Sequence, residues 1–148
     1  MVRPEQGALT AKKLGEIPIV PAAHERYLAR ATPLAAPEDL ARHRLVGFDR
    51  DESMLRAFAA MGLPLPREAF ALRTDDQVAY AHLVAAGGGI GFLADYVQRA
   101  LPGVQPLLPA LKIPPLPVWL AVHREIRGNP AVRRVYDFLA EALSLRLA

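Results

Sequence analysis

Cysteine is absent from the sequence, and its absence removes several kinds of chemistry at once. It excludes a disulfide framework, a thiolate metal site and a cysteine nucleophile, and it fits a reducing compartment. Serine is scarce as well, because Ser53 and Ser144 are its only occurrences. Neither serine stands in the Gly-x-Ser-x-Gly turn of a serine hydrolase, so a serine triad is not expected.

The sequence also lacks a long apolar run and a cluster of charge of one sign. No stretch is long enough to span a bilayer, and the start MVRPEQGALTAKKLGEI lacks the charged-then-apolar order of a signal peptide. We therefore expect a cytoplasmic protein. The net charge is +3, but the arginines are spread from Arg3 to Arg146 among acidic residues. This spread favours a mixed solvated surface over a nucleic-acid footprint.

The 148 residues, 52% of them hydrophobic and 22% charged, suit one globular domain. Fourteen prolines fall mainly between short apolar runs and divide the chain into many short elements. The alternation of these elements predicts an α/β sheet whose neighbouring strands are mostly parallel. Strands are expected over 17–23, 44–48, 70–73, 89–93, 104–109 and 118–123, and helices over 25–31, 37–42, 53–61, 74–87, 94–100 and from 130 to the C-terminus.

Two of these helices carry more detailed expectations. Thr74, with Gln77 three residues later, matches a capping box, which would place Asp75 and Asp76 in the first turn of a helix. His82 is expected on or near the buried side of that helix. Asn129 is expected to cap the last helix. The predicted apolar stripe of this last helix consists of Val132, Val135, Leu139, Leu143 and Leu147.

Other patterns favour structural interpretations over chemical ones. The four histidines are scattered, with no pair at the spacing of zinc ligands. The glycines of 87–91 follow a helix and precede a strand, the reverse of a dinucleotide-binding fingerprint. Asp49, Asp51 and Glu52 precede a helix, where acidic residues are expected as caps rather than as an acid/base or metal cluster. The sequence therefore indicates no metal site, no cofactor and no catalytic residue.

One constellation remains. The predicted strands 44–48 and 70–73 each run directly into the start of a helix. Ligands of open α/β sheets bind outside the carboxyl ends of the strands, so Phe48, Asp49, Arg50, Arg73 and Thr74 are expected to face one crevice. That these residues are only structural caps and surface arginines remains an equal alternative.

Three stretches resemble, in order, the effector-binding domain of LysR-type transcriptional regulators. They are ALTAKKLGEIPIVPAAHERYLARATPLAAPEDLARHRLVGFDRD, LRTDDQVAYAHLVAAGGGIGFLADY and PLPVWLAVHREIRGNPAVRRVYDFLAEAL. The first is similar to the crossing between the two subdomains of that family, with Tyr27-Leu28, Pro37-Glu38-Asp39-Leu40 and His43 in the family's order. The second resembles its helix–glycine–strand unit, although Ala94 replaces a usual proline, and the third resembles its closing strand and last helix.

The resemblance implies an α/β fold like that of type 2 periplasmic binding proteins, with two subdomains and two crossovers. It places residues 1–15 and 104–148 in subdomain I and residues 16–103 in subdomain II. The start MVRPEQG resembles a point inside such a domain. The family's helix-turn-helix and the opening of subdomain I therefore have no expected counterpart here, and subdomain I is expected to be incomplete.

The function implied by the resemblance is sensing of a small-molecule effector, with a carboxylate as one candidate, by a regulator that is not an enzyme. A homodimer is implied, with DNA bound only through the missing N-terminal domain and no contact with a membrane. An arginine would hold a ligand carboxylate, Thr74 would donate a hydrogen bond and Phe48 would pack on an apolar body. The ligand-binding candidates are Phe48, Asp49, Arg50, Arg73, Thr74 and Asp75. A small enzyme and a solute-binding protein on a similar two-lobed fold are the alternatives.

Overall fold

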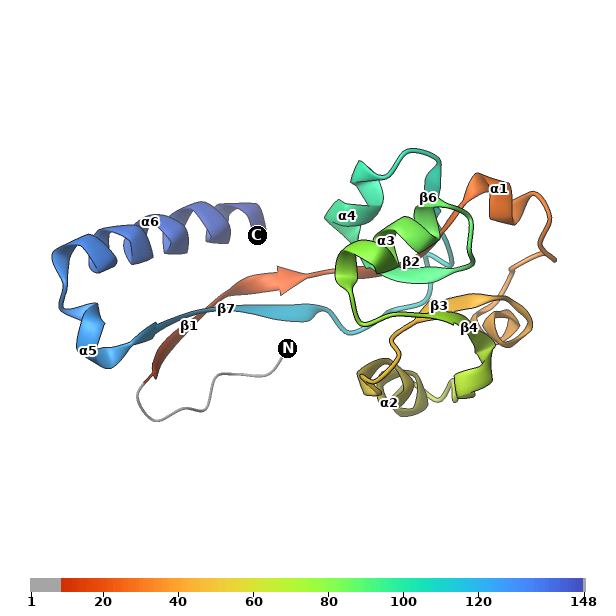
Figure 1. Ribbon diagram of the computed structural model, residues 1–148, viewed down its shortest axis with the longest axis horizontal. Helices are drawn as coiled ribbons and strands as arrows, with labels where there is room; N and C mark the ends of the chain where they lie inside the picture. Colours follow the sequence, from red (N-terminus) through yellow and green to blue (C-terminus); the bar gives the residue numbers. More distant parts are fainter. Residues whose placement is uncertain (1–8, 148) are drawn as a thin grey trace. The chain divides into compact units, whose positions relative to one another are not determined.

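The computed structural model describes residues 9–147, which form two compact units (Figure 1). Of these described residues, the first unit contains 9–18 and 114–147, and the second runs from Ile19 to Ile113. The sequence analysis began the second subdomain at residue 16 and ended it at residue 103, three and ten residues earlier than here. The later second boundary has a clear cause, because strand β6 (Val104–Pro106) hydrogen-bonds β2 (Ile19–His24) within the second unit. In residues 9–147, no helix has both the length and the apolarity of a membrane span.

The sheet of the second unit is mixed. Strand β2 pairs antiparallel with β5 (Gly91–Ala94) on one side and with β6 on the other. Strand β3 (Leu45–Gly47) pairs parallel with β4 (Phe70–Arg73). A parallel bridge from Leu45 to Ile90 links β3 to the start of β5. The described strands of this unit therefore follow the order β4-β3-β5-β2-β6.

The expectation of mostly parallel neighbours was wrong, and the reason lies in one strand. Strands β3, β4 and β5 follow one another through helices, and a helical crossover returns the chain in the same direction. Strand β2 enters the unit without such a crossover and runs the opposite way between β5 and β6. Each of its pairings is consequently antiparallel.

Short helices surround this sheet (Figure 1). The one with the best-defined buried face is α3, whose inward side chains are Tyr80 and Val84. The sequence had pointed to His82 instead, and this histidine is exposed. The helices are α1 (Glu25–Leu28), the 3-10 turn η1 (Pro37–Arg42), α2 (Ser53–Ala60), the 3-10 turn η2 (Arg67–Ala69), α3 (Gln77–Ala85) and α4 (Asp95–Ala100).

The hydroxyl of Tyr80 explains why this face of α3 turns inward. It donates a hydrogen bond to the carbonyl of Val46 at 3.0 Å and accepts one from the N–H of Phe92 at 2.8 Å. One side chain thus satisfies two buried backbone groups, on β3 and on β5. Its complete burial raises the pKa of Tyr80, so the phenol remains a donor.

The first unit is simpler. Strand β1 (Leu9–Ile17) pairs antiparallel with β7 (Leu116–His123), and the long helix α6 (Pro130–Leu147) follows the short α5 (Arg124–Arg127) and packs on both strands. Gly15 allows a close approach, because a Cβ there would lie 2.6 Å from Cβ of Leu147. Asn129 precedes α6 as expected, and its Oδ1 accepts a hydrogen bond from the N–H of Ala131 at 2.9 Å. Val135, which the sequence analysis placed in the apolar stripe of this helix, is 58% exposed.

Candidate functional site

The carboxyl ends of β3 and β4 lie side by side in the second unit. The two strands are parallel, with Gly47 paired to Arg73. The N–H of Thr74 donates to the carbonyl of Gly47 at 3.0 Å, which extends the contact one residue beyond the strands. The segment that begins at Phe48 and the one that begins at Thr74 therefore leave the sheet at the same edge, where ligands of α/β folds are usually bound.

Asp75 joins these two segments. Its carboxylate accepts hydrogen bonds from three successive backbone N–H groups, those of Asp49 at 2.9 Å, Arg50 at 3.1 Å and Asp51 at 3.4 Å. The N–H of Arg50 is the largest cause of a lowered pKa of Asp75, and the N–H groups of Asp49 and Asp51 and the Arg50 charge act in the same direction. The Asp75 carboxylate therefore occupies the anion-binding site formed by these N–H groups and fixes the conformation of the loop after β3.

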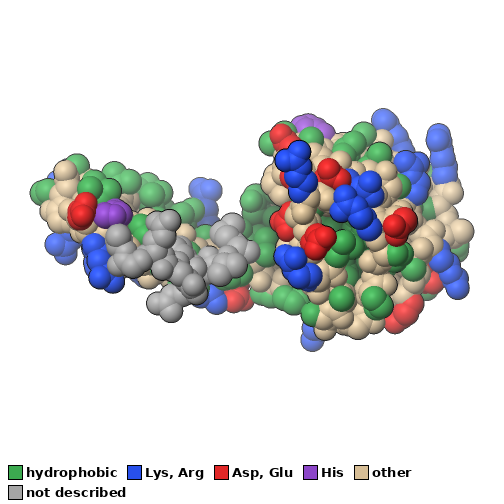
Figure 2. Space-filling view, turned by 60° about the horizontal axis from the view of Figure 1, so that its bottom comes forward, with side chains coloured by type: hydrophobic (Ala, Val, Ile, Leu, Met, Phe, Trp, Pro, Cys, Tyr) green, Lys and Arg blue, Asp and Glu red, His purple; other side chains and the backbone are tan. Residues whose placement is uncertain are grey.

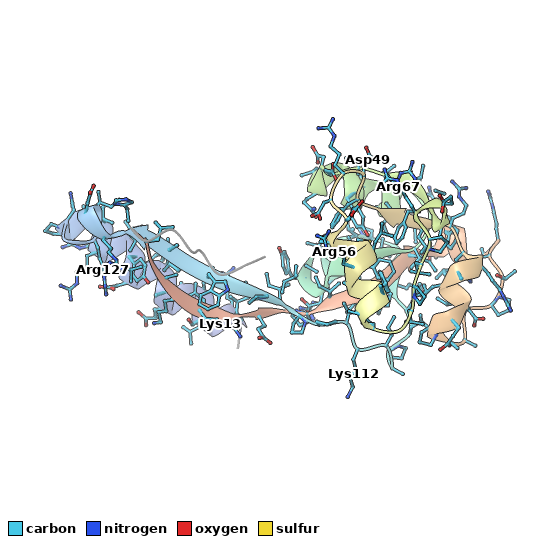
Figure 3. All side chains as sticks on the ribbon, turned by 90° about the horizontal axis from the view of Figure 1, so that it is seen from below. Lys13, Asp49, Arg56, Arg67, Lys112 and Arg127 are labelled. Atoms are coloured by element: carbon cyan, nitrogen blue, oxygen red, sulfur yellow. The ribbon has the colours of Figure 1, made fainter. Side chains whose placement is uncertain are left out.

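Asp49 is the centre of a second set of contacts. Its Oδ1 lies 3.0 Å from Nη2 of Arg67 and 3.4 Å from Nε of Arg73. Arg67 also donates from Nη1 to the backbone carbonyl of Asp49 at 2.8 Å. Figure 3 shows Asp49 and Arg67 on the same side of the second unit. One carboxylate thus forms ion pairs with two guanidinium groups of the site.

The helix after β4 begins later than the capping box predicted. Asp76, rather than Thr74, is the N-cap, and its Oδ1 accepts from the N–H groups of Val78 and Ala79 at 2.8 and 2.9 Å. The N–H of Thr74 is bonded to the carbonyl of Gly47 in the sheet, so it is not available to the Gln77 side chain, as a capping box requires. Its hydroxyl oxygen instead accepts from the N–H of Asp76 at 3.2 Å. Asp75 consequently precedes the helix and is free to reach across to the other loop.

Phe48 provides the apolar side of the site. Its ring lies 5.4 Å from that of Tyr80, centroid to centroid, and it borders a small cavity. The cavity volume is about 10 Å³, close to the room that one water molecule needs. A ligand would therefore lie over this hollow rather than within it. The lining is Phe48, Asp51, Met54, Leu55, Arg67, Phe70 and Arg73.

The structure brings together all six residues that the sequence analysis selected, although nothing in it tests whether they bind a ligand. Within residues 9–147, the Arg50 side chain is exposed and has no ion pair, whereas Arg73 is paired with Asp49. Sequence reasoning missed Arg67, which lies in the turn before β4 rather than after a strand. Proximity to Asp49 is visible only in three dimensions, so no sequence signal indicated it.

A larger hollow, of about 250 Å³, lies in the first unit between β7, α5 and the start of α6. None of the six ligand-binding candidates borders it. Its lining is Val122, Arg127, Val132, Arg133, Tyr136 and Asp137.

Comparison with known proteins gives a consistent result. The family model described as "LysR substrate binding domain" matches residues 2–144. None of the curated proteins matches this sequence. Among solved structures, the regulatory domain of CrgA, a LysR-type transcriptional regulator from Neisseria meningitidis, is similar with a TM-score of 0.80 and 24% identity. The match covers 96% of this chain and 72% of that domain.

Two further structures define how much of the relatives the chain spans. The longer CrgA structure is similar with a TM-score of 0.77 and 24% identity over 94% of this chain, which corresponds to 49% of CrgA. The effector domain of AmpR from Pseudomonas aeruginosa has a TM-score of 0.71 at 18% identity, with 96% of this chain and 68% of that domain covered. The chain thus spans about half of the longer CrgA protein. At these identities, the likenesses establish the fold.

Proposed function

The chain belongs to the family of LysR substrate-binding domains, the effector-binding domains of LysR-type transcriptional regulators, and we propose that it binds its effector at the joined ends of β3 and β4. Domains of this family belong to transcriptional regulators rather than to enzymes. Their fold is the α/β fold of type 2 periplasmic binding proteins, as the sequence indicated.

The observation that carries the proposal is the contact of Asp75 with the loop after β3. Because three N–H groups of that loop are already bonded to Asp75, they are not available to a ligand anion. The effector carboxylate is then recognised by guanidinium groups. Arg50, which has no ion pair within residues 9–147, binds it first, and Arg73, which Asp49 already holds, binds it next. The hydroxyl of Thr74 donates a hydrogen bond to the effector, and Phe48 packs on the apolar body of the effector. Asp49 and Asp75 hold the two loops in place.

Calorimetric titration of this chain with a panel of small aliphatic, aromatic and amino-acid carboxylates tests the site. We expect Arg50→Gln to weaken the tightest ligand of the panel by about tenfold or more, the loss of one charge-assisted hydrogen bond. Lys112→Gln is the matched control, since it removes the same charge from the other side of the second unit (Figure 3). Equal losses in both variants would mean that the effect is one of net charge, and unchanged affinity in Arg50→Gln would refute the site.

The remaining parts of the proposal concern the whole regulator. We propose that it acts in the cytoplasm as a homodimer and contacts DNA through a segment outside these 148 residues. Support comes from the family match and from the described charges of the domain, which are interleaved in sign. In an electrophoretic mobility assay at physiological salt, this chain alone is expected to retain no specific operator fragment.

A further inference from the structure

The charged side chains of the candidate site balance one another. Three arginines and three aspartates surround the ends of β3 and β4: Arg50, Arg67, Arg73, Asp49, Asp51 and Asp75. The neighbouring Glu52 and Arg56 pair with each other at 3.7 Å, and Asp76 is the N-cap of α3. Figure 2 shows basic and acidic side chains interleaved over one face of the second unit. A ligand of zero net charge keeps this balance, whereas a bare carboxylate adds an uncompensated negative charge.

Most of these charges already have protein partners. Asp49 forms ion pairs with two of the arginines, and Asp75 holds the loop after β3 through its backbone N–H groups. Arg50 and Asp51 differ, because neither has an ion-pair partner among residues 9–147. They are consecutive in that loop, and their N–H groups donate to the Asp75 carboxylate at 3.1 and 3.4 Å. The loop therefore offers a ligand one unpaired positive charge and, next to it, one unpaired negative charge.

Asp51 has the position and the charge to bind a cationic group. It borders the small cavity, as do Phe48 and Arg73. Its Oδ1 accepts a hydrogen bond from the N–H of Ser53 at 2.8 Å. This hydrogen bond lowers the pKa of Asp51, so the carboxylate is ionised at neutral pH. An ionised carboxylate beside an apolar hollow is an acceptor for an ammonium group.

We propose that the ligand of this site is a small α-amino acid in its zwitterionic form, with its carboxylate on Arg50 and its ammonium group on Asp51. This inference rests on the proposed function, because it assigns a ligand class to the same site. The two charged groups of an α-amino acid are attached to one carbon atom, which matches two opposite charges on consecutive residues. The cavity of about 10 Å³ is bordered by Phe48 and other apolar residues. The amino-acid side chain is therefore uncharged and lies over this apolar lining.

Calorimetric titration of the full chain with matched sets of three compounds tests the ligand class. Each set contains an α-amino acid, the desamino acid that retains only the carboxylate, and the amine that retains only the ammonium group. The sets are built on alanine, valine, leucine and phenylalanine, so that valine is compared with isovalerate and isobutylamine. In the set that binds most tightly, we expect the amino acid to bind about tenfold more tightly than either other compound, or better still. Each of those compounds lacks one charge-assisted hydrogen bond.

The outcomes separate this inference from the proposed function. A desamino acid that binds as tightly as its amino acid, and that loses affinity in Arg50→Gln, would overturn the zwitterionic ligand alone and leave the carboxylate site intact. Amino-acid binding that is unchanged in Arg50→Gln would overturn both. Absence of binding by all the compounds would overturn the assignment of an α-amino acid.

Asp51→Asn supplies a readout that a folding defect cannot mimic. Asparagine keeps an Oδ1 acceptor for the N–H of Ser53 but removes the charge. We expect this variant to bind the amino acid about tenfold more weakly and the desamino acid as well as the parent does, whereas Arg50→Gln weakens both. Glu52→Gln is the matched control, since it removes the same charge from the next residue, which is paired with Arg56. Equal losses of amino-acid affinity in Asp51→Asn and Glu52→Gln would overturn the proposal.

Discussion

The two units of this chain differ most in how much of their own apolar surface they bury. The second unit contains all the buried apolar residues of the described chain except Leu14, Val122 and Ala140. The first unit, although much shorter, contains five of the seven large hydrophobic side chains that are exposed: Leu116, Ile126, Val135, Phe138 and Leu145.

This difference follows from the number of layers. The second unit has helices around a mixed sheet, so α2 and α3 can each bury a side chain against it. The first has one long helix packed on two strands. Domains gain stability when packed layers share a core. We therefore expect the second unit to be the more stable part of the chain.

The largest expected effect compares one phenylalanine from each unit. Phe58 on α2 is 3% exposed, and its ring meets Phe92 edge-on at 4.6 Å, whereas Phe138 on α6 is 67% exposed. Phe58→Ala is expected to lower the free energy of unfolding by about 3–5 kcal/mol, and Phe138→Ala by no more than about 0.5 kcal/mol. Urea denaturation at low protein concentration, where chains are monomeric, measures both. Similar losses would mean that the two units do not differ in stability.

The sequence predicts the positions of most elements of both units, because the prolines and glycines that bound them are local signals. Prediction from the sequence fails where the burial of a side chain depends on contacts with residues that are distant in the sequence. Val135 looks like a core residue because apolar periodicity shows that a helix has a stripe, but not which of two stripes faces the sheet. Tyr80 was missed because a tyrosine is buried only where its hydroxyl finds partners, and those partners are Val46 and Phe92.

The candidate site shows the same limit. Its six residues could be predicted because parallel strands that lead into helices release their chains at one edge. The roles within it could not, since they depend on long-range pairs such as Asp75 with the loop after β3 and Arg67 with Asp49. The start of α3 was misplaced because Thr74 and Asp76 are both good local caps, and the sequence does not show which of them begins the helix. Whether the site binds an effector remains a prediction.

A smaller effect is expected for one hydroxyl group in each unit. Tyr80→Phe removes the partner of the Val46 carbonyl and of the Phe92 N–H, both in the buried core. We expect it to cost about 1–3 kcal/mol of unfolding free energy. Tyr136→Phe on α6, where the tyrosine is half-buried, is the counterpart and is expected to change stability by less than about 0.5 kcal/mol. Thermal and urea denaturation of the two variants give the difference, and equal stabilities would show that the Tyr80 hydroxyl does not link β3 to β5.

The smallest effect concerns pH and compares Asp75 in the second unit with Asp137 on α6. The N–H of Arg50, with those of Asp49 and Asp51, lowers the pKa of Asp75 in the folded protein. Because the lowered pKa belongs to the folded state, the ionised form stabilises the fold. That contribution is complete above the ordinary aspartate pKa of about 3.9 and disappears as the pH falls through the folded value.

Asp75→Asn is thus expected to have a lower free energy of unfolding than the parent at pH 7, and this difference is expected to narrow toward acid pH. Asp137→Asn, which alters only an exposed pair with Arg133, is expected to track the parent throughout. Urea denaturation across this pH range measures both variants. Parallel curves for Asp75→Asn and the parent would mean that the three N–H groups do not hold the carboxylate, and that the loop after β3 is fixed in some other way.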